Sequence, residues 1–135
     1  MRISVATGHL PRAQQYLLHD APGRFKVLVT HRRFGKTVFA VNELISGAKS
    51  CRLPQPRFAY LAPFHIQAKD VAWSYLKHYT AKIPDITVNE SELWVELPPR
   101  IEHDSGSGGA RIRLYGADNA DRLRGLYFDG VVLDE

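Results

Sequence analysis

The sequence is poor in cysteine and contains no long hydrophobic run. Cys51 is the only cysteine among 135 residues, which excludes an internal disulfide and a cysteine-based metal site. Residues 1–8 lack the apolar core of a secretory signal, and no stretch approaches the ~20 apolar residues of a membrane span. These absences predict a soluble, cytoplasmic protein without a membrane partner, because a reducing compartment leaves cysteine unpaired.

The composition is that of a folded domain with a small excess of positive charge. Apolar residues make up 44% of the chain and charged residues 24%, so the chain can bury a core of its own. The formal net charge is +4 and the isoelectric point is near 9.4, which suits a polyanionic partner without identifying one.

The predicted helices and strands alternate along the chain. Helical spacing of apolar residues predicts helices over residues 11–20, 37–49 and 65–81. Apolar runs predict buried strands at residues 25–29, 57–62 and 130–133, and alternating runs predict antiparallel strands at residues 86–89, 93–97 and 110–115. This order predicts a single α/β domain built on a parallel sheet with a β excursion.

The segment T-H-R-R-F-G-K-T lies between the first predicted strand and the helix that follows it. It ends like a phosphate-binding loop, G-x-x-x-x-G-K-[ST], with Thr30 in place of the first glycine. In such a loop Gly35 lets the backbone approach a phosphate, Lys36 reaches the β- and γ-phosphates, and the Thr37 hydroxyl holds Mg²⁺. A basic surface turn in front of a helix is the alternative. The predicted nucleotide-binding residues are Thr30, His31, Arg32, Arg33, Phe34, Gly35, Lys36 and Thr37.

Two acids end the last predicted strand. Asp134 and Glu135 directly follow the apolar run 131–133. Phosphoryl transfer to water needs a carboxylate for Mg²⁺ and a second one to orient the water, and both belong at the carboxyl edge of a parallel sheet. An acid also commonly ends a strand that runs into solvent. The two motifs together, in this order, predict a nucleotide-binding site that also holds Mg²⁺.

The same residues resemble the large terminase subunit of tailed bacteriophages. The resemblance rests on R-R-F-G-K-T at 32–37, Y-L-A-P-F-H-I-Q-A-K at 60–69, and G-A-D-N-A-D-R-L-R-G at 116–125 followed by L-D-E at 133–135. An arginine-rich phosphate loop without its first glycine is typical of that family. The resemblance implies a P-loop NTPase of the catalytic-glutamate type, with a mostly parallel sheet flanked by helices and an antiparallel excursion.

The implied activity is that of an ATP-driven motor that packages double-stranded DNA into a procapsid. The implied partners are double-stranded DNA, the small terminase subunit and the portal ring, and the implied assembly is a homo-oligomeric ring. The implied roles are phosphate binding for Lys36, Mg²⁺ binding for Thr37 and Asp134, and catalysis for Glu135. Arg32 corresponds to the loop arginine proposed in such motors to act on the γ-phosphate in cis.

Two further roles follow from the resemblance. Arg124, just before Gly125, corresponds to an arginine proposed to act on the ATP of a neighbouring subunit. Gln14 corresponds to a glutamine that recognises adenine, with Gln15 as the alternative if the register is shifted by one residue.

The resemblance also implies that residues 1–135 are the N-terminal part of an ATPase domain. A complete motor has further ATPase strands and a nuclease domain, so an excerpt and a truncated prophage product are both open. In related P-loop ATPases the next strand inserts between the phosphate-loop strand and the acid-bearing strand. Its absence would leave a gap with unpaired backbone groups in the sheet, unless something else fills that gap.

Two other functions remain open at this level. A helicase-like DNA-dependent ATPase is one, because residues 60–67 are also similar to the strand and loop after the phosphate loop of helicases. A catalytically inactive prophage remnant that binds nucleotide, DNA or a partner subunit is the other.

Overall fold

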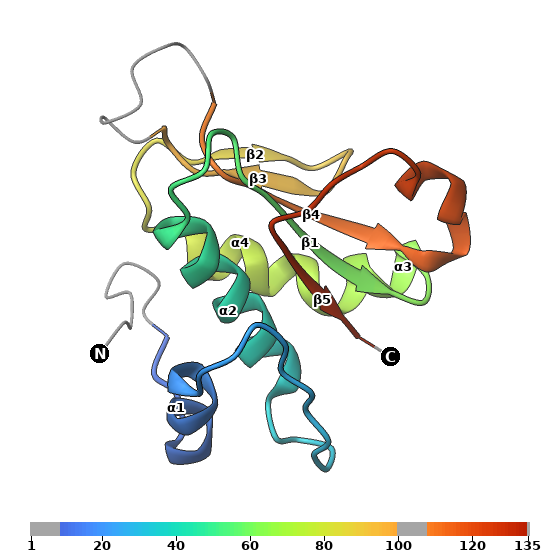
Figure 1. Cartoon of the computed structure of the whole chain (residues 1–135). Helices are drawn as coiled ribbons and strands as arrows, with labels where there is room; N and C mark the ends of the chain where they lie inside the picture. Colours follow the sequence, from blue (N-terminus) through green and yellow to red (C-terminus); the bar gives the residue numbers. More distant parts are fainter. Residues whose placement is uncertain (1–8, 100–107, 135) are drawn as a thin grey trace.

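The computed structural model describes residues 9–99 and 108–134 and shows a mixed α/β fold (Figure 1). Its strands form one five-stranded sheet in the order β2-β3-β4-β1-β5. The strand bounds are Arg57–Ala62 for β1, Thr87–Asn89 for β2, Trp94–Glu96 for β3, Arg111–Gly116 for β4 and Gly130–Leu133 for β5.

Strand β1 lies between two parallel neighbours. It pairs in parallel with β4 on one side and with β5 on the other, and Tyr60 lies opposite Leu114 and Val132. Strand β3 pairs antiparallel with both β2 and β4. The sheet is therefore mixed, and the expectation that residues 110–115 belong to an antiparallel excursion is correct only toward β3. The alternating pattern of β4 indicates that one face of the strand is covered. It does not indicate whether the neighbouring strands run parallel or antiparallel to it.

The helices match the sequence pattern closely. Helix α1 covers Ala13–Asp20 and α2 covers Lys36–Ser50. The predicted helix 65–81 is a continuous run of α3 (His65–Ala68), the π-helical turn η1 (Lys69–Trp73) and α4 (Ser74–Thr80). The 3-10 segment η2 (Ala117–Leu123) was not expected. In the part of the chain that the structure describes, no helix is long and apolar enough to cross a membrane.

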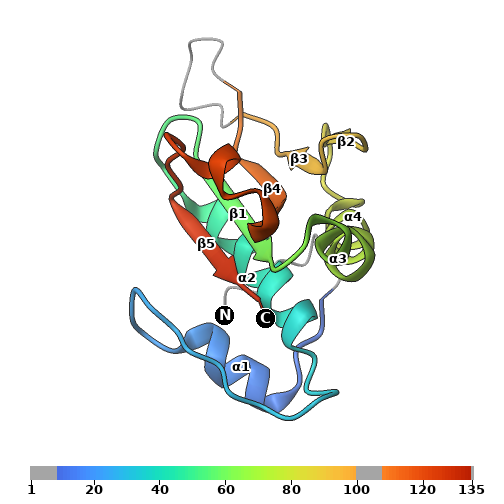
Figure 2. The same cartoon turned by 90° about the vertical axis from the view of Figure 1, so that its right-hand side faces the viewer.

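The core lies between the sheet and the helices α2 and α4. Both helices are on the same side of the sheet (Figures 1 and 2), and α2 contacts β1, β4, β5 and α4. Ile45 of α2, Leu76 of α4 and Ile112 of β4 are at most 1% exposed. This packing fixes the start of α2 against the sheet.

The predicted buried strand at residues 25–29 is wrong. These residues form no strand, and the side chains of Phe25, Val27 and Val29 are 83%, 89% and 92% exposed. Strand β5 is the edge of the sheet, with no neighbour on its outer side among the described residues. An apolar run becomes a strand through pairing and burial, and here neither is available to it. A further strand is expected on this outer side of β5, where none lies among the described residues.

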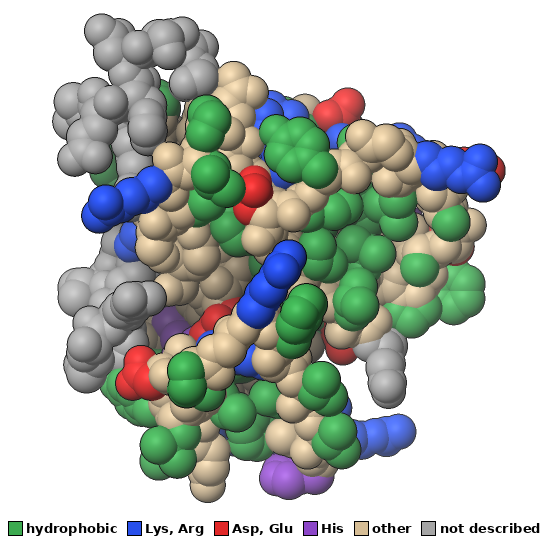
Figure 3. Space-filling view, viewed as in Figure 1, with side chains coloured by type: hydrophobic (Ala, Val, Ile, Leu, Met, Phe, Trp, Pro, Cys, Tyr) green, Lys and Arg blue, Asp and Glu red, His purple; other side chains and the backbone are tan. Residues whose placement is uncertain are grey.

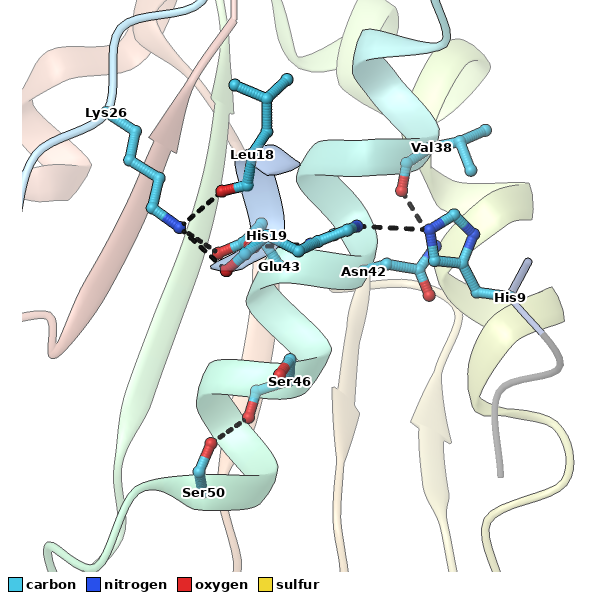
Figure 4. Close-up of polar contacts among 9 residues, drawn as sticks. All are labelled: His9, Leu18, His19, Lys26, Val38, Asn42, Glu43, Ser46 and Ser50. Atoms are coloured by element: carbon cyan, nitrogen blue, oxygen red, sulfur yellow. Dashed lines mark hydrogen bonds and ion pairs between the residues drawn. The ribbon is translucent and has the colours of Figure 1, made fainter. Parts of the chain in front are cut away.

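A polar network holds α1 and the segment after it to α2 (Figure 4). The His19 Nδ1 atom lies 2.5 Å from Glu43 Oε1, and Lys26 Nζ lies 3.5 Å from Glu43 Oε2. Lys26 Nζ also donates to the carbonyl oxygens of Leu18 and His19 at 3.0 and 3.3 Å. The network attaches the chain on both sides of residues 21–25 to α2, ahead of the loop at residues 30–35.

His9 predicts a pH dependence of stability. It is 6% exposed, and its Nε2 lies 3.3 Å from Nε2 of His19. Burial, and then the charge of His19, lower the pKa of His9 below its ordinary value of 6.5. Between the lowered pKa and 6.5 the unfolded chain binds more protons than the folded chain, so this contribution to stability is lost as the pH falls through that window.

The free energy of unfolding is therefore expected to fall as the pH is lowered from about 7.5 to about 5, and His9→Gln should flatten this dependence. Urea unfolding at a series of pH values measures it. His78→Gln, at an exposed histidine of α4, is the control. Identical pH profiles for wild type and His9→Gln would contradict the role of His9.

Candidate nucleotide-binding site

The loop at residues 30–35 leads into the N-terminus of α2. Gly35 is the N-cap of α2 with φ 89° and ψ 33°, and Arg33 is also left-handed at φ 67°. The amide of Phe34 donates to the carbonyl of His31 at 3.4 Å, which closes a turn. Gly35 has no side chain that could cap the helix, and among the described residues no hydrogen bond from a capping side chain replaces it, so the first amides of α2 are left for another acceptor. Such an end favours an anion, because the helix dipole is positive there.

Gln15 supports the loop from α1. This side chain is 4% exposed, and its Nε2 donates to the carbonyl oxygens of Phe34 and Gly35, both at 3.3 Å. Its Oε1 accepts from the backbone amide of Arg12 at 3.0 Å. Gln14 is exposed on the outer side of α1. Of the two glutamines, the alternative Gln15 is the one beside the loop, and the adenine-binding role of Gln14 stays a prediction.

Gly35 has a positive φ, and a side chain added there would also have to displace Gln15. A Cβ at Gly35 would lie 2.8 Å from Gln15 Nε2, in addition to the strain of a positive φ. Gly35→Ala is expected to lower the free energy of unfolding by about 1–3 kcal/mol, measured by urea denaturation. Gly125→Ala is the matched control, because Gly125 has φ +76° and nothing within 4 Å of the added carbon. If Gly35→Ala and Gly125→Ala lose the same free energy of unfolding, the contact with Gln15 does not contribute to the loss.

Lys36 is available to an anion. Its Nζ contacts only the carbonyl oxygen of Thr30, at 3.5 Å, and it pairs with no described carboxylate. The Thr30 hydroxyl is buried and has no hydrogen-bond partner among the described residues. The position where a first glycine is expected therefore holds a side chain whose polar atom is turned inward and unsatisfied.

Thr37 and Asp134 meet at the hydroxyl of Tyr60. Asp134 continues β5, since its amide donates to the carbonyl of Leu61 at 2.8 Å. The Tyr60 hydroxyl donates to Asp134 Oδ2, and the Thr37 side chain lies close enough to interact with the same hydroxyl. Burial, then the hydrogen bond to Asp134 and its charge, raise the pKa of Tyr60 far above its ordinary value, while the Thr37 hydrogen bond opposes the rise.

Sequence reasoning missed Tyr60. It lies within the 60–69 segment that carries the family resemblance, but nothing in the pattern separates it from an ordinary aromatic residue of a buried strand. The available signal is chemical, because a buried tyrosine hydroxyl almost always needs a partner. In this fold the partner is the Asp134 carboxylate, directly after β5, and Thr37 in the first turn of α2 lies beside the same hydroxyl.

The oxygen donors of Thr37 and Asp134 fit Mg²⁺. This ion prefers one or two carboxylates together with hydroxyl, phosphate and water oxygens, and it seldom occupies a cage made only of protein ligands. Within residues 9–99 and 108–134, no three His, Cys, Asp or Glu side chains converge on a metal position. The donor set therefore suits an ion that is shared with a bound phosphate.

The loop residues before Gly35 contact one another and Arg12. Arg32 and Arg33 are exposed, and the Arg33 carbonyl accepts from Arg12 Nη1 at 3.2 Å. His31 Nδ1 contacts the Arg32 carbonyl, and the His31 and Phe34 rings are 6.3 Å apart. The exposed guanidinium groups are free to reach an anion at the loop.

The two remaining predicted catalytic residues lie elsewhere. Arg124 follows η2, its side chain is 86% exposed, and its Nε lies 3.6 Å from Asp121 Oδ1. An ion pair this exposed contributes little to stability, which leaves the guanidinium group available. Glu135 lies outside the described residues, so its catalytic role stays a prediction.

Comparisons with known proteins identify the fold. The sequence matches no protein-family model and no curated protein. The structure is similar to the large terminase ATPase domain of Thermus phage P74-26, at a TM-score of 0.78 and 23% identity. It is equally similar to an arginine-to-alanine mutant of that domain, at a TM-score of 0.78 and 22% identity. Both matches cover 100% of this chain but only 59% of the solved chain, so this chain spans well under two thirds of those structures.

Proposed function

We propose that residues 1–135 are the N-terminal part of the ATPase domain of a large terminase subunit from a tailed bacteriophage or prophage. The observation that carries this proposal is that Tyr60 is hydrogen-bonded to Asp134 and lies beside Thr37. Two segments far apart in the sequence thus bring together the two residues that we expect to act as ligands of Mg-ATP. The likeness to a terminase ATPase domain supports the same conclusion. In this account the whole protein hydrolyses ATP to package double-stranded DNA, as a homo-oligomeric ring working with a small subunit and a portal ring.

Each residue has a physical task in ATP hydrolysis. The first amides of α2 and Lys36 bind the phosphates, and Arg32 adds positive charge where charge builds up in the transition state. Thr37 and Asp134 would hold Mg²⁺, and the chemistry that this ion supplies when bound is neutralisation of charge on the phosphate oxygens. Glu135 would orient the attacking water and accept its proton.

The rest of the domain would complete the sheet beside β5. Apolar side chains gather near β5 on the face shown in Figure 3. Within β5 itself, the side chains of Val131 and Leu133 are 44% and 77% exposed. We include in the proposal a further strand of the same protein, inserted between β5 and residues 25–29. It would pair with the outer edge of β5 and cover the apolar side chains of both segments.

Lys36→Ala tests the proposed function. Loss of a charge-assisted contact with phosphate is expected to weaken Mg-ATP binding by about 10- to 100-fold, because such contacts contribute about 1.5–3 kcal/mol. Isothermal titration calorimetry measures the dissociation constants. Lys82→Ala, which removes an exposed lysine remote in sequence from the loop, should bind Mg-ATP as the wild type does. Equal affinities for Lys36→Ala and the wild type would exclude the loop as the phosphate site.

A further inference from the structure

Tyr60 is held rigidly at the point where the two ligand-bearing segments meet. It is 1% exposed and belongs to the core formed with α2, which includes Val41 and Ile45. Its backbone is fixed on both sides, opposite Leu114 of β4 and Val132 of β5. The ring therefore has little freedom, and its hydroxyl has a defined position relative to the ends of β5 and the start of α2.

The hydrogen-bond capacities of the three side chains determine the direction of each bond. A tyrosine hydroxyl has one proton to donate, and an ionised carboxylate can only accept. The Tyr60 proton is therefore committed to Asp134 Oδ2. The Thr37 hydroxyl lies beside the phenol oxygen, and because the Tyr60 proton is already committed, Thr37 can interact with that oxygen only as a donor.

This arrangement leaves the right atoms available for a cation. With its proton given to Tyr60, the Thr37 oxygen keeps its lone pairs for another partner. Asp134 keeps one carboxylate oxygen, Oδ1, outside the bond with Tyr60. A hydroxyl ligand binds a metal ion through its oxygen, so a fixed acceptor for its proton prepares it for that contact.

We propose that Tyr60 is a positioning residue that orients Thr37 and Asp134 toward Mg²⁺ when nucleotide binds. This inference rests on the proposed function, because it concerns the same metal ligands. A tyrosine that only fills the core would affect stability alone. A positioning tyrosine affects how much Mg²⁺ is needed for ATP to bind, because outer partners of metal ligands tune the affinity of the site.

The test is Tyr60→Phe, which keeps the ring in the core and removes only the shared hydroxyl. Binding of a fluorescent ATP analogue is titrated with Mg²⁺, and separately measured in EDTA. The Mg²⁺ concentration at half-saturation is expected to rise by about 10-fold or more, while affinity in EDTA is unchanged. Tyr115→Phe is the matched control, because this tyrosine of β4 alternates with the buried Leu114 and so lies on the opposite face of the sheet.

A double-mutant cycle gives a second, independent readout. If Tyr60 acts through Asp134, Asp134→Asn should raise the half-saturating Mg²⁺ concentration, and adding Tyr60→Phe should raise it little further. Fully additive effects would overturn the inference. Urea unfolding of each variant shows that the proteins compared are folded.

The outcomes distinguish a failure of the positioning role of Tyr60 from a failure of the proposed function. If the wild type binds ATP with a clear Mg²⁺ dependence and Tyr60→Phe has the same half-saturation, the positioning role is wrong and the proposed function stands. If the wild type does not bind Mg-ATP, the proposed function fails and the inference fails with it.

Discussion

Glu135→Gln, made in the whole protein, is expected to retain ATP binding and nearly abolish ATP turnover. A glutamine amide has almost the size of the carboxylate but cannot accept a proton from the attacking water, which lowers the rate by about 10²–10⁴-fold. Steady-state hydrolysis and equilibrium binding of ATP, measured on the same preparations, give both quantities.

Asp134→Asn is the matched comparison for Glu135→Gln. The account assigns Asp134 to the metal, so its neutral amide should raise the Mg²⁺ concentration that hydrolysis requires. The contacts of Asp134 support this assignment, because Asp134 accepts a hydrogen bond from Tyr60, whose hydroxyl also lies beside Thr37. Exchanged phenotypes, with a shifted Mg²⁺ requirement in Glu135→Gln, would reverse the two assignments.

Arg124→Ala is expected to leave ATP affinity of the monomer unchanged and to lower DNA-stimulated hydrolysis by the assembled ring by about 10³-fold or more. The guanidinium is 86% exposed and its ion pair with Asp121 is long, at 3.6 Å. It can therefore reach a neighbouring subunit without breaking a strong contact. Arg122→Ala, at an exposed arginine two residues earlier in η2, is the control and should stay active.

Mixed rings separate a role in trans from a role in cis. An Arg124→Ala subunit keeps its own site, and a Glu135→Gln subunit keeps its arginine. If the arginine serves the neighbour, a mixture of the two inactive variants regains partial activity. A mixture that assembles but stays inactive, while rings mixed with wild type work, would leave Arg124 with a local structural or DNA-facing role.

Local sequence signals predicted most of the elements around the site. The period of apolar residues located α1, α2 and the 65–80 helical run, and the apolar run 131–133 located β5. The G-K-T sequence placed Lys36 and Thr37 at the start of a helix, which the structure confirms for the helix. These features depend on residues that are close together in the sequence, so they can be predicted from a single sequence.

The features that the sequence did not predict, or left open, depend on interactions between distant segments. Residues 25–29 have a strand composition but no strand to pair with, and the alternation in β4 does not reveal that β1 is its parallel neighbour. Whether Gln14 or Gln15 lies beside the loop depends on how α1 is rotated about its own axis. Tyr60 gains its contacts only when β1 is placed between α2 and β5.

The central claim is that residues 30–37 and Asp134 form one Mg-ATP site, and amide hydrogen exchange tests it most directly. Exchange is compared with and without saturating Mg-ATP, residue by residue. The account predicts slower exchange, by about 10-fold or more, at residues 31–37 and at the end of β5, with little change in β2 and β3. Unchanged exchange across residues 31–37 under saturating nucleotide, or protection confined to another part of the chain, would contradict the account.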